Sequence, residues 1–264
     1  MSQTIEATGA TGKKSVFEGT DPQVRVRTKK MLMYFIIFAI VMLFAGFTSA
    51  YIVSNMGEYW VHINPPMSLW YSNAIILVSS VSMISALRAM KRGNKQLTMI
   101  MLATTLALGV AFTFTQQAAW KELRSKGMGW TINTTEAGLK AYSWNNISEI
   151  TGEYGTDYYV HKDGSKLAMH EGQFYAANDP TFAVPLTGKV TNMNNNSGAF
   201  IWVLIIIHIM HLVFGLIYLT VNLIRTSKGI INQHDTVRLE TNGIYWHFLG
   251  ILWVYLFAFL FLIH

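Results

Sequence analysis

The sequence predicts an all-α integral membrane protein in which five transmembrane helices form a bundle. Of its 264 residues, 52% are hydrophobic and only 13% are charged, whereas a typical soluble chain is about 25% charged. The hydrophobic residues gather in five blocks that contain no Asp, Glu, Lys or Arg. Each block is close to the ~20 residues that a helix needs to cross a ~30 Å hydrocarbon layer. The composition therefore excludes a water-soluble enzyme and a disordered chain.

The five blocks follow one another at 31–53, 68–87, 97–119, 199–224 and 243–263. Each is apolar on nearly all sides, as expected of a helix surrounded by lipid. A transmembrane β-barrel needs strands of about ten residues that alternate apolar and polar side chains, and the blocks do not alternate. The first block is longer than the apolar core of a signal peptide, so we interpret it as a retained span.

Basic residues in the short connections predict the orientation in the membrane. Six precede the first block, none lies between the first two blocks, four follow the second block and three follow the fourth. Because positively charged loops stay in the cytoplasm, the N-terminus is predicted to be cytoplasmic and the C-terminus periplasmic. The net charge of +6 then reflects topology and contact with anionic lipids, and no nucleic-acid partner is expected.

These boundaries divide the chain into a cytoplasmic tail at 1–30, helices one to three at 31–119, a periplasmic insertion at 120–198 and helices four and five at 199–264. The insertion is either a surface decoration or a docking surface for a periplasmic partner.

The insertion is also predicted to contain a small β-structure. Asp163-Gly164 lies between short apolar or aromatic runs, which favours a β-hairpin. Residues 182–184 are expected to add a third strand, and the Asn-rich stretch 192–197 to form turns that lead into the fourth span.

Polar side chains at membrane depth are costly unless they face a partner. Small residues in the first block, such as the pairs Ala45/Ser49 and Gly46/Ala50, predict close helix packing. The chain has no Cys, and no Asp lies inside a block. Neither a thiolate metal site nor a nucleophilic triad is therefore predicted, and no catalytic, cofactor-binding or metal-ligating residue is expected.

Seven polar residues in or beside the spans are candidates for structural and lipid contacts: Asn73, Gln116, His208, His211, Glu240, Trp246 and His247. Haem ligation by the histidines would need imidazoles on different helices at one depth. At 1.5 Å per residue, His211 lies ~18 Å below the outer edge of its span, whereas His247 lies only ~6 Å above the inner edge of its own. We therefore expect His208 and His211 to hydrogen-bond to neighbouring helices, and Glu240, Trp246 and His247 to anchor the start of the last span.

The spans carry motifs that resemble one family. Glu240-Thr-Asn-Gly-Ile-Tyr-Trp-His-Phe248, followed by Trp253, is similar to the closing helix of subunit III of haem–copper cytochrome oxidases, Glu-x-x-x-x-Tyr-Trp-His-Phe-x-x-x-x-Trp. His208-Ile-Met-His211-Leu-Val-Phe-Gly215 resembles the family's His-x-x-His-x-x-x-Gly helix. The likeness touches all five blocks in order, leaves out 1–28 and most of 120–198, and corresponds to the short five-helix bacterial form.

The resemblance implies an accessory, non-catalytic subunit of a respiratory aa3- or caa3-type cytochrome c oxidase in the bacterial inner membrane. It implies contact with oxidase subunits I and II, of which subunit I is the main partner, and with phospholipids. Haem a and copper are expected in the partner subunits. A cytochrome c donor module or a neighbouring respiratory complex is a further partner expected at 120–198.

The alternatives are a subunit III homologue of a quinol oxidase or of a nitric oxide reductase, or a small-molecule transporter. Three positions also depart from the family. Ile40, Ala119 and Gly250 stand where the family often has acidic residues, so no proton or lipid role of those carboxylates is expected here.

Overall fold

The computed structural model describes residues 22–55, 59–128, 130–134, 140–144, 150–191, 197–233 and 235–263. Within them, five helices are long and apolar enough to cross a membrane, which confirms the predicted fold class and makes the chain a multi-pass membrane protein. The spanning helices are α1 (Pro22–Asn55), α2 (Met67–Lys91), α3 (Lys95–Ser125), α5 (Ser197–Ser227) and α6 (Val237–Ala258), and a π-helical segment at Phe259–Ile263 continues α6.

Several helices extend beyond the predicted hydrophobic blocks. Helix α2 continues to Lys91 and α3 to Ser125, through polar and charged residues. The turn between α2 and α3 shows how a helix boundary is set. Gly93 has a positive φ of 76°, a conformation that glycine adopts without steric cost. Asn94 then caps α3, because its side-chain oxygen accepts a hydrogen bond from the backbone N–H of Leu97 at 3.0 Å.

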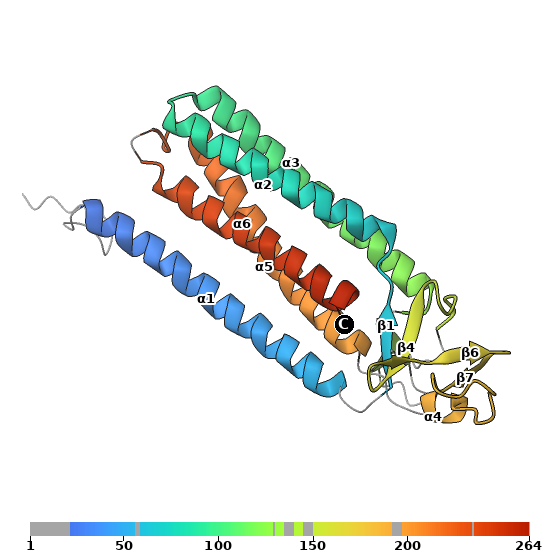
Figure 1. Ribbon diagram of the computed structural model, residues 1–264. Helices are drawn as coiled ribbons and strands as arrows, with labels where there is room; N and C mark the ends of the chain where they lie inside the picture. Colours follow the sequence, from blue (N-terminus) through green and yellow to red (C-terminus); the bar gives the residue numbers. More distant parts are fainter. Residues whose placement is uncertain are drawn as a thin grey trace, which may run out of the picture.

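The helices run side by side, with α6 in a central position and α1 at the edge (Figure 1). Helix α6 packs against α1, α2 and α5, whereas α1 packs on α5 and α6. Only 17% of the most apolar window of α1 is buried, against 61% in α6. The small residues Ala45, Gly46, Ser49 and Ala50 are exposed. The close packing predicted from them is therefore not made with another described helix of this chain.

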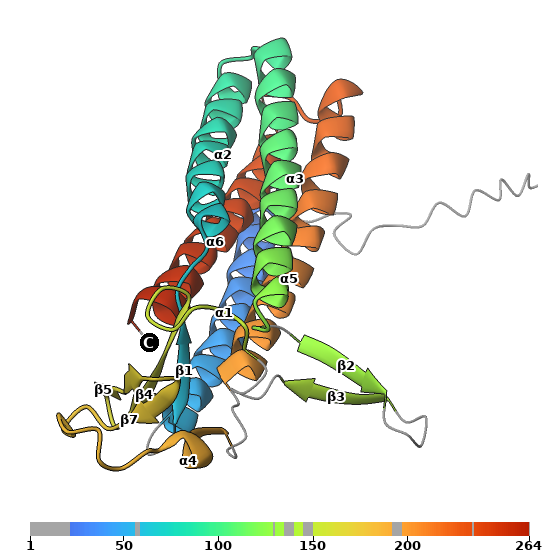
Figure 2. The same ribbon diagram turned by 90° about the vertical axis from the view of Figure 1, so that its right-hand side faces the viewer.

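Short strands gather at one end of the helices, which we call the strand end (Figure 2). The opposite end, which carries the α2–α3 and α5–α6 connections, is the loop end. The elements at the strand end are β1 (Trp60–Ile63), β2 (Trp130–Thr134), β3 (Lys140–Trp144), β4 (Tyr158–Lys162), β5 (Ser165–Lys166), β6 (Ala168–His170), β7 (Gln173–Tyr175) and the short helix α4 (Thr187–Thr191).

Strand pairing joins two connections that are far apart in the sequence. Strand β1, from the α1–α2 connection, pairs antiparallel with β4 from the insertion, and β5 completes a sheet in the order β1-β4-β5. Within the described residues, β2 and β3 pair only with each other, as do β6 and β7. The insertion is therefore fastened to the first connection by backbone hydrogen bonds.

The hairpin predicted at Asp163-Gly164 is confirmed. Strands β4 and β5 pair antiparallel on either side of these two residues, whose φ angles of 49° and 76° suit a tight two-residue turn. The third strand predicted at 182–184 is wrong. The Asp179 carboxylate accepts hydrogen bonds from the N–H groups of Ala183 and Val184, so these donors are unavailable to a partner strand. Of the predicted turn at 192–197, residues 192–196 lie outside the described residues.

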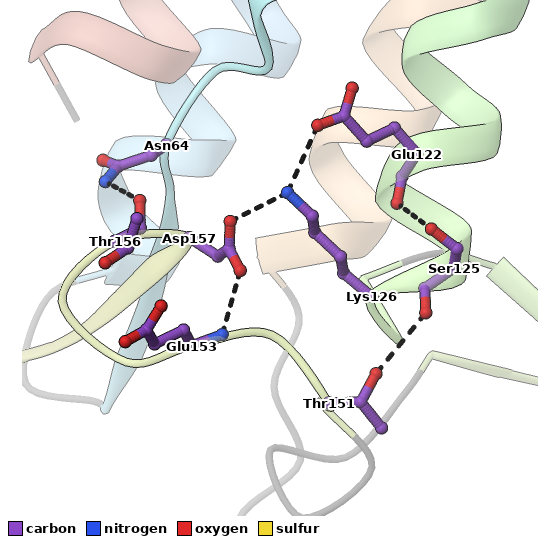
Figure 3. A network of polar contacts seen from close by, with 8 residues as sticks. All are labelled: Asn64, Glu122, Ser125, Lys126, Thr151, Glu153, Thr156 and Asp157. Carbon is purple, nitrogen blue, oxygen red and sulfur yellow. Dashed lines mark hydrogen bonds and ion pairs between the residues drawn. The ribbon is translucent and has the colours of Figure 1, made fainter.

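A polar network connects the insertion to the end of α3 (Figure 3). The Lys126 amine lies 2.8 Å from Oδ1 of Asp157 and 3.2 Å from Oε1 of Glu122. The side chain of Asn64, just after β1, donates to the carbonyl of Thr156 at 2.6 Å. The network thus fixes the chain before β4 to both α3 and the first connection.

Candidate functional site

A cavity of about 430 Å³ lies between α1 and the pair α5 and α6. We call it the α1 cleft. Its walls are mostly apolar, with one imidazole and two phenol groups among them. The residues that line it are Met33, Ile36, Ala39 and Ile40 from α1, His211, Phe214 and Tyr218 from α5, and Tyr245 from α6.

The cleft exists because α1 is fastened at both ends. At the strand end, the buried ring of Tyr51 meets Trp60 and Phe259 edge-on, at centroid distances of 5.1 and 5.3 Å. The Trp60 indole also donates to the Tyr51 hydroxyl at 2.9 Å. At the loop end, the Lys30 amine lies 2.7 Å from the Glu240 carboxylate. The cleft occupies the stretch of α1 between these two anchors.

The polar groups of the cleft are tied to the helices that carry them. The Nδ1 atom of His211 lies 2.8 Å from the carbonyl of Ile207, on its own helix; since a carbonyl only accepts, Nδ1 carries the proton. The backbone carbonyl of His211 accepts from the Tyr245 hydroxyl at 3.2 Å. The side-chain bond across helices predicted for His211 is therefore replaced by one within α5, and its backbone makes the contact with α6.

His208 lies in the core and not in the cleft. Its side chain is buried, with its ring centroid 6.5 Å from Phe112 of α3 and 5.3 Å from Trp253 of α6. Nδ1 of His208 has no hydrogen-bond partner in the described part of the chain, and neither has the side-chain amide of the buried Gln116. The bond predicted from His208 to a neighbouring helix is thus absent there, and aromatic packing takes its place.

Trp246 joins three helices at the centre of the bundle. Its fully buried indole donates to the hydroxyl of Ser79 on α2 at 3.0 Å. Helix α3 passes close at Gly109, where an added Cβ would lie 2.7 Å from Cη2 of Trp246 and 2.8 Å from Cδ2 of Leu216. Gly109 therefore makes room for the indole ring.

Glu240 and His247 lie on a second cavity, of about 410 Å³, between α2 and α6. We call it the α2/α6 cavity. The Glu240 carboxylate lies 2.9 Å from the Lys91 amine and 2.7 Å from that of Lys30. Through Glu240, the first turn of α6 is thus bound to the N-terminal part of α1 and to the last turn of α2.

The predicted polar residues do not form one site. Asn73 stands on α2, with a buried Oδ1 that lacks a partner in the described residues. His208 and Gln116 face the core, while His211, Glu240 and His247 are distributed over the two cavities.

Sequence reasoning missed several cavity residues. Tyr218 was not singled out at all. Arg88, which lines the α2/α6 cavity, and Lys30, which pairs with Glu240, were counted only among the basic residues that predict the orientation. No group of three or more His, Asp or Glu residues that could hold a metal ion is found in the described ranges.

Comparison with known proteins shows that the last two spans are similar to one family. The family model of cytochrome c oxidase subunit III matches residues 188–263, which include α5 and α6. Cytochrome c oxidase subunit 3 of Alkalihalophilus pseudofirmus is 23% identical over 188 residues, which cover 71% of this chain and 62% of that protein.

Two further relatives match over shorter stretches. Cytochrome c oxidase subunit 3 of Bacillus subtilis is 29% identical over 65 residues, or 25% of this chain and 31% of the relative. That of Bacillus sp. strain PS3 is 31% identical over 55 residues, or 21% and 27%. The matches therefore span less than two thirds of the length of each relative.

Proposed function

We propose that this chain is a member of the family of cytochrome c oxidase subunit III and that it is an accessory, non-catalytic subunit of a respiratory aa3- or caa3-type oxidase. The match over residues 188–263 carries the proposal. It includes both motif-bearing helices, with His211 and Tyr245 in the α1 cleft and Glu240, which pairs with Lys30 and Lys91 at the loop end. We call these two ion pairs the Glu240 clamp. In this proposal haem a and copper belong to partner subunits, and this chain supplies none of their ligands.

The proposed partner in the membrane is oxidase subunit I, with subunit II as a further contact. The exposed surface of the helices supports a partner. Helix α1 alone exposes Leu32, Phe35, Phe38, Met42 and Val53, and apolar surface of this kind must be covered by lipid or by another protein. The proposed complex lies in a bacterial inner membrane. In this proposal the N-terminus of the chain is cytoplasmic and its C-terminus is periplasmic, an orientation that the basic residues of the loop end favour.

We propose that the α1 cleft holds a phospholipid acyl chain. Its walls are apolar along Met33, Ile36 and Phe214, and the hydroxyls of Tyr218 and Tyr245 give it a few polar points. Ile40 forms part of the wall and is buried, so no acidic group stands at that position. An apolar cleft with few fixed polar groups suits a long hydrocarbon chain better than a polar solute.

The insertion is the proposed contact for a cytochrome c donor module or a neighbouring respiratory complex. The β2–β3 hairpin projects from the strand end in Figure 2 and pairs with no other strand in the described residues. Deleting 130–144 removes it and leaves the β1–β4 pairing intact. Slower oxidation of the donor by membranes is expected, and unchanged oxidation together with unchanged co-purification would exclude this contact.

A deletion strain tests the proposed function. Membranes that lack this chain should contain less assembled oxidase, measured as haem a absorbance and as oxygen consumption with a cytochrome c donor. Re-expression of the full chain should restore both quantities. Normal haem a and normal respiration in the deletion strain would contradict a role in the oxidase.

A further inference from the structure

We propose that the α2/α6 cavity binds one anionic phospholipid, with its phosphate at Arg88 and Lys91 and an acyl chain along the apolar wall. The inference rests on the lipid-binding part of the proposed function and adds to it a second, charge-selective site. The α1 cleft and this cavity share no lining residue, so the two sites can be tested separately.

The cavity has the two-part character of a phospholipid. Its walls are hydrocarbon where Met83, Ile84 and Leu87 of α2 face Ile244 of α6. Gly243 of α6 also lines it, and an added Cβ there would come within 3.6 Å of Met83 Cε. The absence of a side chain at 243 leaves open the space between the helices. A volume of about 410 Å³ is far more than one water needs, since a water occupies about 30 Å³ of liquid.

The charged part of the cavity carries an excess of positive charge. Arg88 and Lys91 stand in the last turn of α2. The Glu240 carboxylate is shared between Lys91, at 2.9 Å, and Lys30, at 2.7 Å, so one negative charge faces three positive ones. No ion pair to Arg88 occurs in the described ranges. Its guanidinium is therefore available to a phosphate, which it can bind through two parallel N–H groups.

The position of the cavity selects a lipid over a free phosphate. The basic residues stand where the α2 span ends, which is headgroup depth, and Met83 and Ile84 lie one to two turns deeper in the span. A free phosphate would satisfy the cations but leave the hydrocarbon walls without a partner. An anionic phospholipid satisfies both, and basic residues near a span end attract lipids with a net negative charge.

The test uses the full chain purified in mild detergent, stripped of lipid and titrated with phosphatidylglycerol, phosphatidylcholine or inorganic phosphate. Bound lipid is counted by native mass spectrometry. We expect Arg88→Gln to weaken phosphatidylglycerol binding about tenfold, the scale of one lost charge-assisted hydrogen bond. Arg92→Gln is the matched control, because Arg92 lies one turn away, is exposed and does not line the cavity.

Three results would overturn the inference. They are equal binding by Arg88→Gln and Arg92→Gln, equal retention of phosphatidylcholine and phosphatidylglycerol, and displacement of phosphatidylglycerol by inorganic phosphate alone. Ile244→Trp provides a second variant, which fills the apolar wall without touching a charge and should also reduce binding. The proposed function is read separately, from co-purification of oxidase subunits. If oxidase subunits co-purify but lipid binding does not depend on Arg88, the proposed function stands and the lipid site is wrong. If lipid binding depends on Arg88 but no oxidase subunit co-purifies, the lipid site stands and the proposed function is wrong.

Discussion

At the residue scale, the packing of Trp246 depends on a side chain that is absent. Trp246 donates to Ser79 and fills the space above Gly109, so three helices meet at one indole ring. The sequence shows Gly109 only as an interruption of an apolar block. That it lies under a tryptophan from another helix is a property of the packed bundle.

Gly109→Ala is expected to destabilise the chain. The new Cβ would lie 2.7 Å from Trp246 and 2.8 Å from Leu216, and overpacking of this kind costs about 1–3 kcal/mol. The measurement is the thermal melting temperature of the full chain in detergent. Gly46→Ala is the matched control, because nothing lies within 4 Å of its added Cβ. Equal melting temperatures for the two variants would show that the close approach at Gly109 does not exist.

The histidines show the limit of sequence reasoning about single residues. Their spacing places His208 and His211 on one general face of a helix. Three residues turn a helix by about 300°, however, so the two side chains point about 60° apart. That difference directs His208 into the core and His211 toward the α1 cleft. Which of the two faces a cavity depends on where α1 stands, and hydrophobic periodicity carries no information about it.

At the element scale, the hydrophobic blocks predicted the five spans well, because lipid requires long helices with internally paired backbones. They predicted the ends poorly, since a helix continues through charged residues as readily as through apolar ones. Helix α3 thus runs to Ser125, past the block that ends at 119. The hairpin at Asp163-Gly164 was predictable because its signal is local. The pairing of β1 with β4 was not, because its two strands belong to different connections.

The ion pair between Lys126 and Asp157 makes the attachment of the insertion depend on pH. Lys126 holds the pKa of Asp157 below its ordinary value of 3.8, and Asp157 holds the pKa of Lys126 above 10.5. On the acid side, the stabilisation is present above the unfolded pKa of Asp157 and is lost as pH falls through the lower folded value. On the alkaline side, it is present below the unfolded pKa of Lys126 and is lost as pH rises through the higher folded value. The attachment should therefore be constant over the neutral range.

Asp157→Asn should loosen the segment around β4 at neutral pH. We expect faster hydrogen exchange there. The free energy of local opening should fall by up to about 1 kcal/mol, the usual range for an ion pair at a protein surface. In the unmodified chain, protection corrected for intrinsic exchange rates should not change between pH 5 and pH 9. Asp163→Asn, a change in a turn residue with no ion pair in the described part of the chain, serves as the control. A step in protection near pH 6 to 7 would mean that another group controls the attachment.

The Glu240 clamp, formed by the ion pairs of Glu240 with Lys30 and Lys91, is expected to fix the distance between α1 and the rest of the bundle at the loop end. Glu240→Gln removes the charge that holds both Lys30 and Lys91. Nitroxide labels at Arg27→Cys and Arg92→Cys report this distance, and the chain contains no other Cys. Electron resonance should show a longer and broader distribution in Glu240→Gln. Glu122→Gln, at the strand end, should leave it unchanged, and the same distribution in both variants would show that Glu240 does not hold α1.

At the scale of the whole molecule, the structure is a bundle that leaves much of its apolar surface to its surroundings. Helix α1 is anchored at Lys30 and Tyr51 and borders the α1 cleft between them, and its small residues Ala45, Gly46, Ser49 and Ala50 are exposed. Both cavities open where α6 meets an outer helix. This open apolar surface supports the proposed contacts with lipids and partner subunits.

The most direct test of the account is purification of the tagged full chain from native membranes in mild detergent. Its partners are identified by mass spectrometry, and a reduced-minus-oxidised visible spectrum is recorded on the same sample. We expect the large oxidase subunits to co-purify and the spectrum to show haem a. A colourless chain isolated without partners, despite gentle extraction, would contradict the assignment as an oxidase subunit.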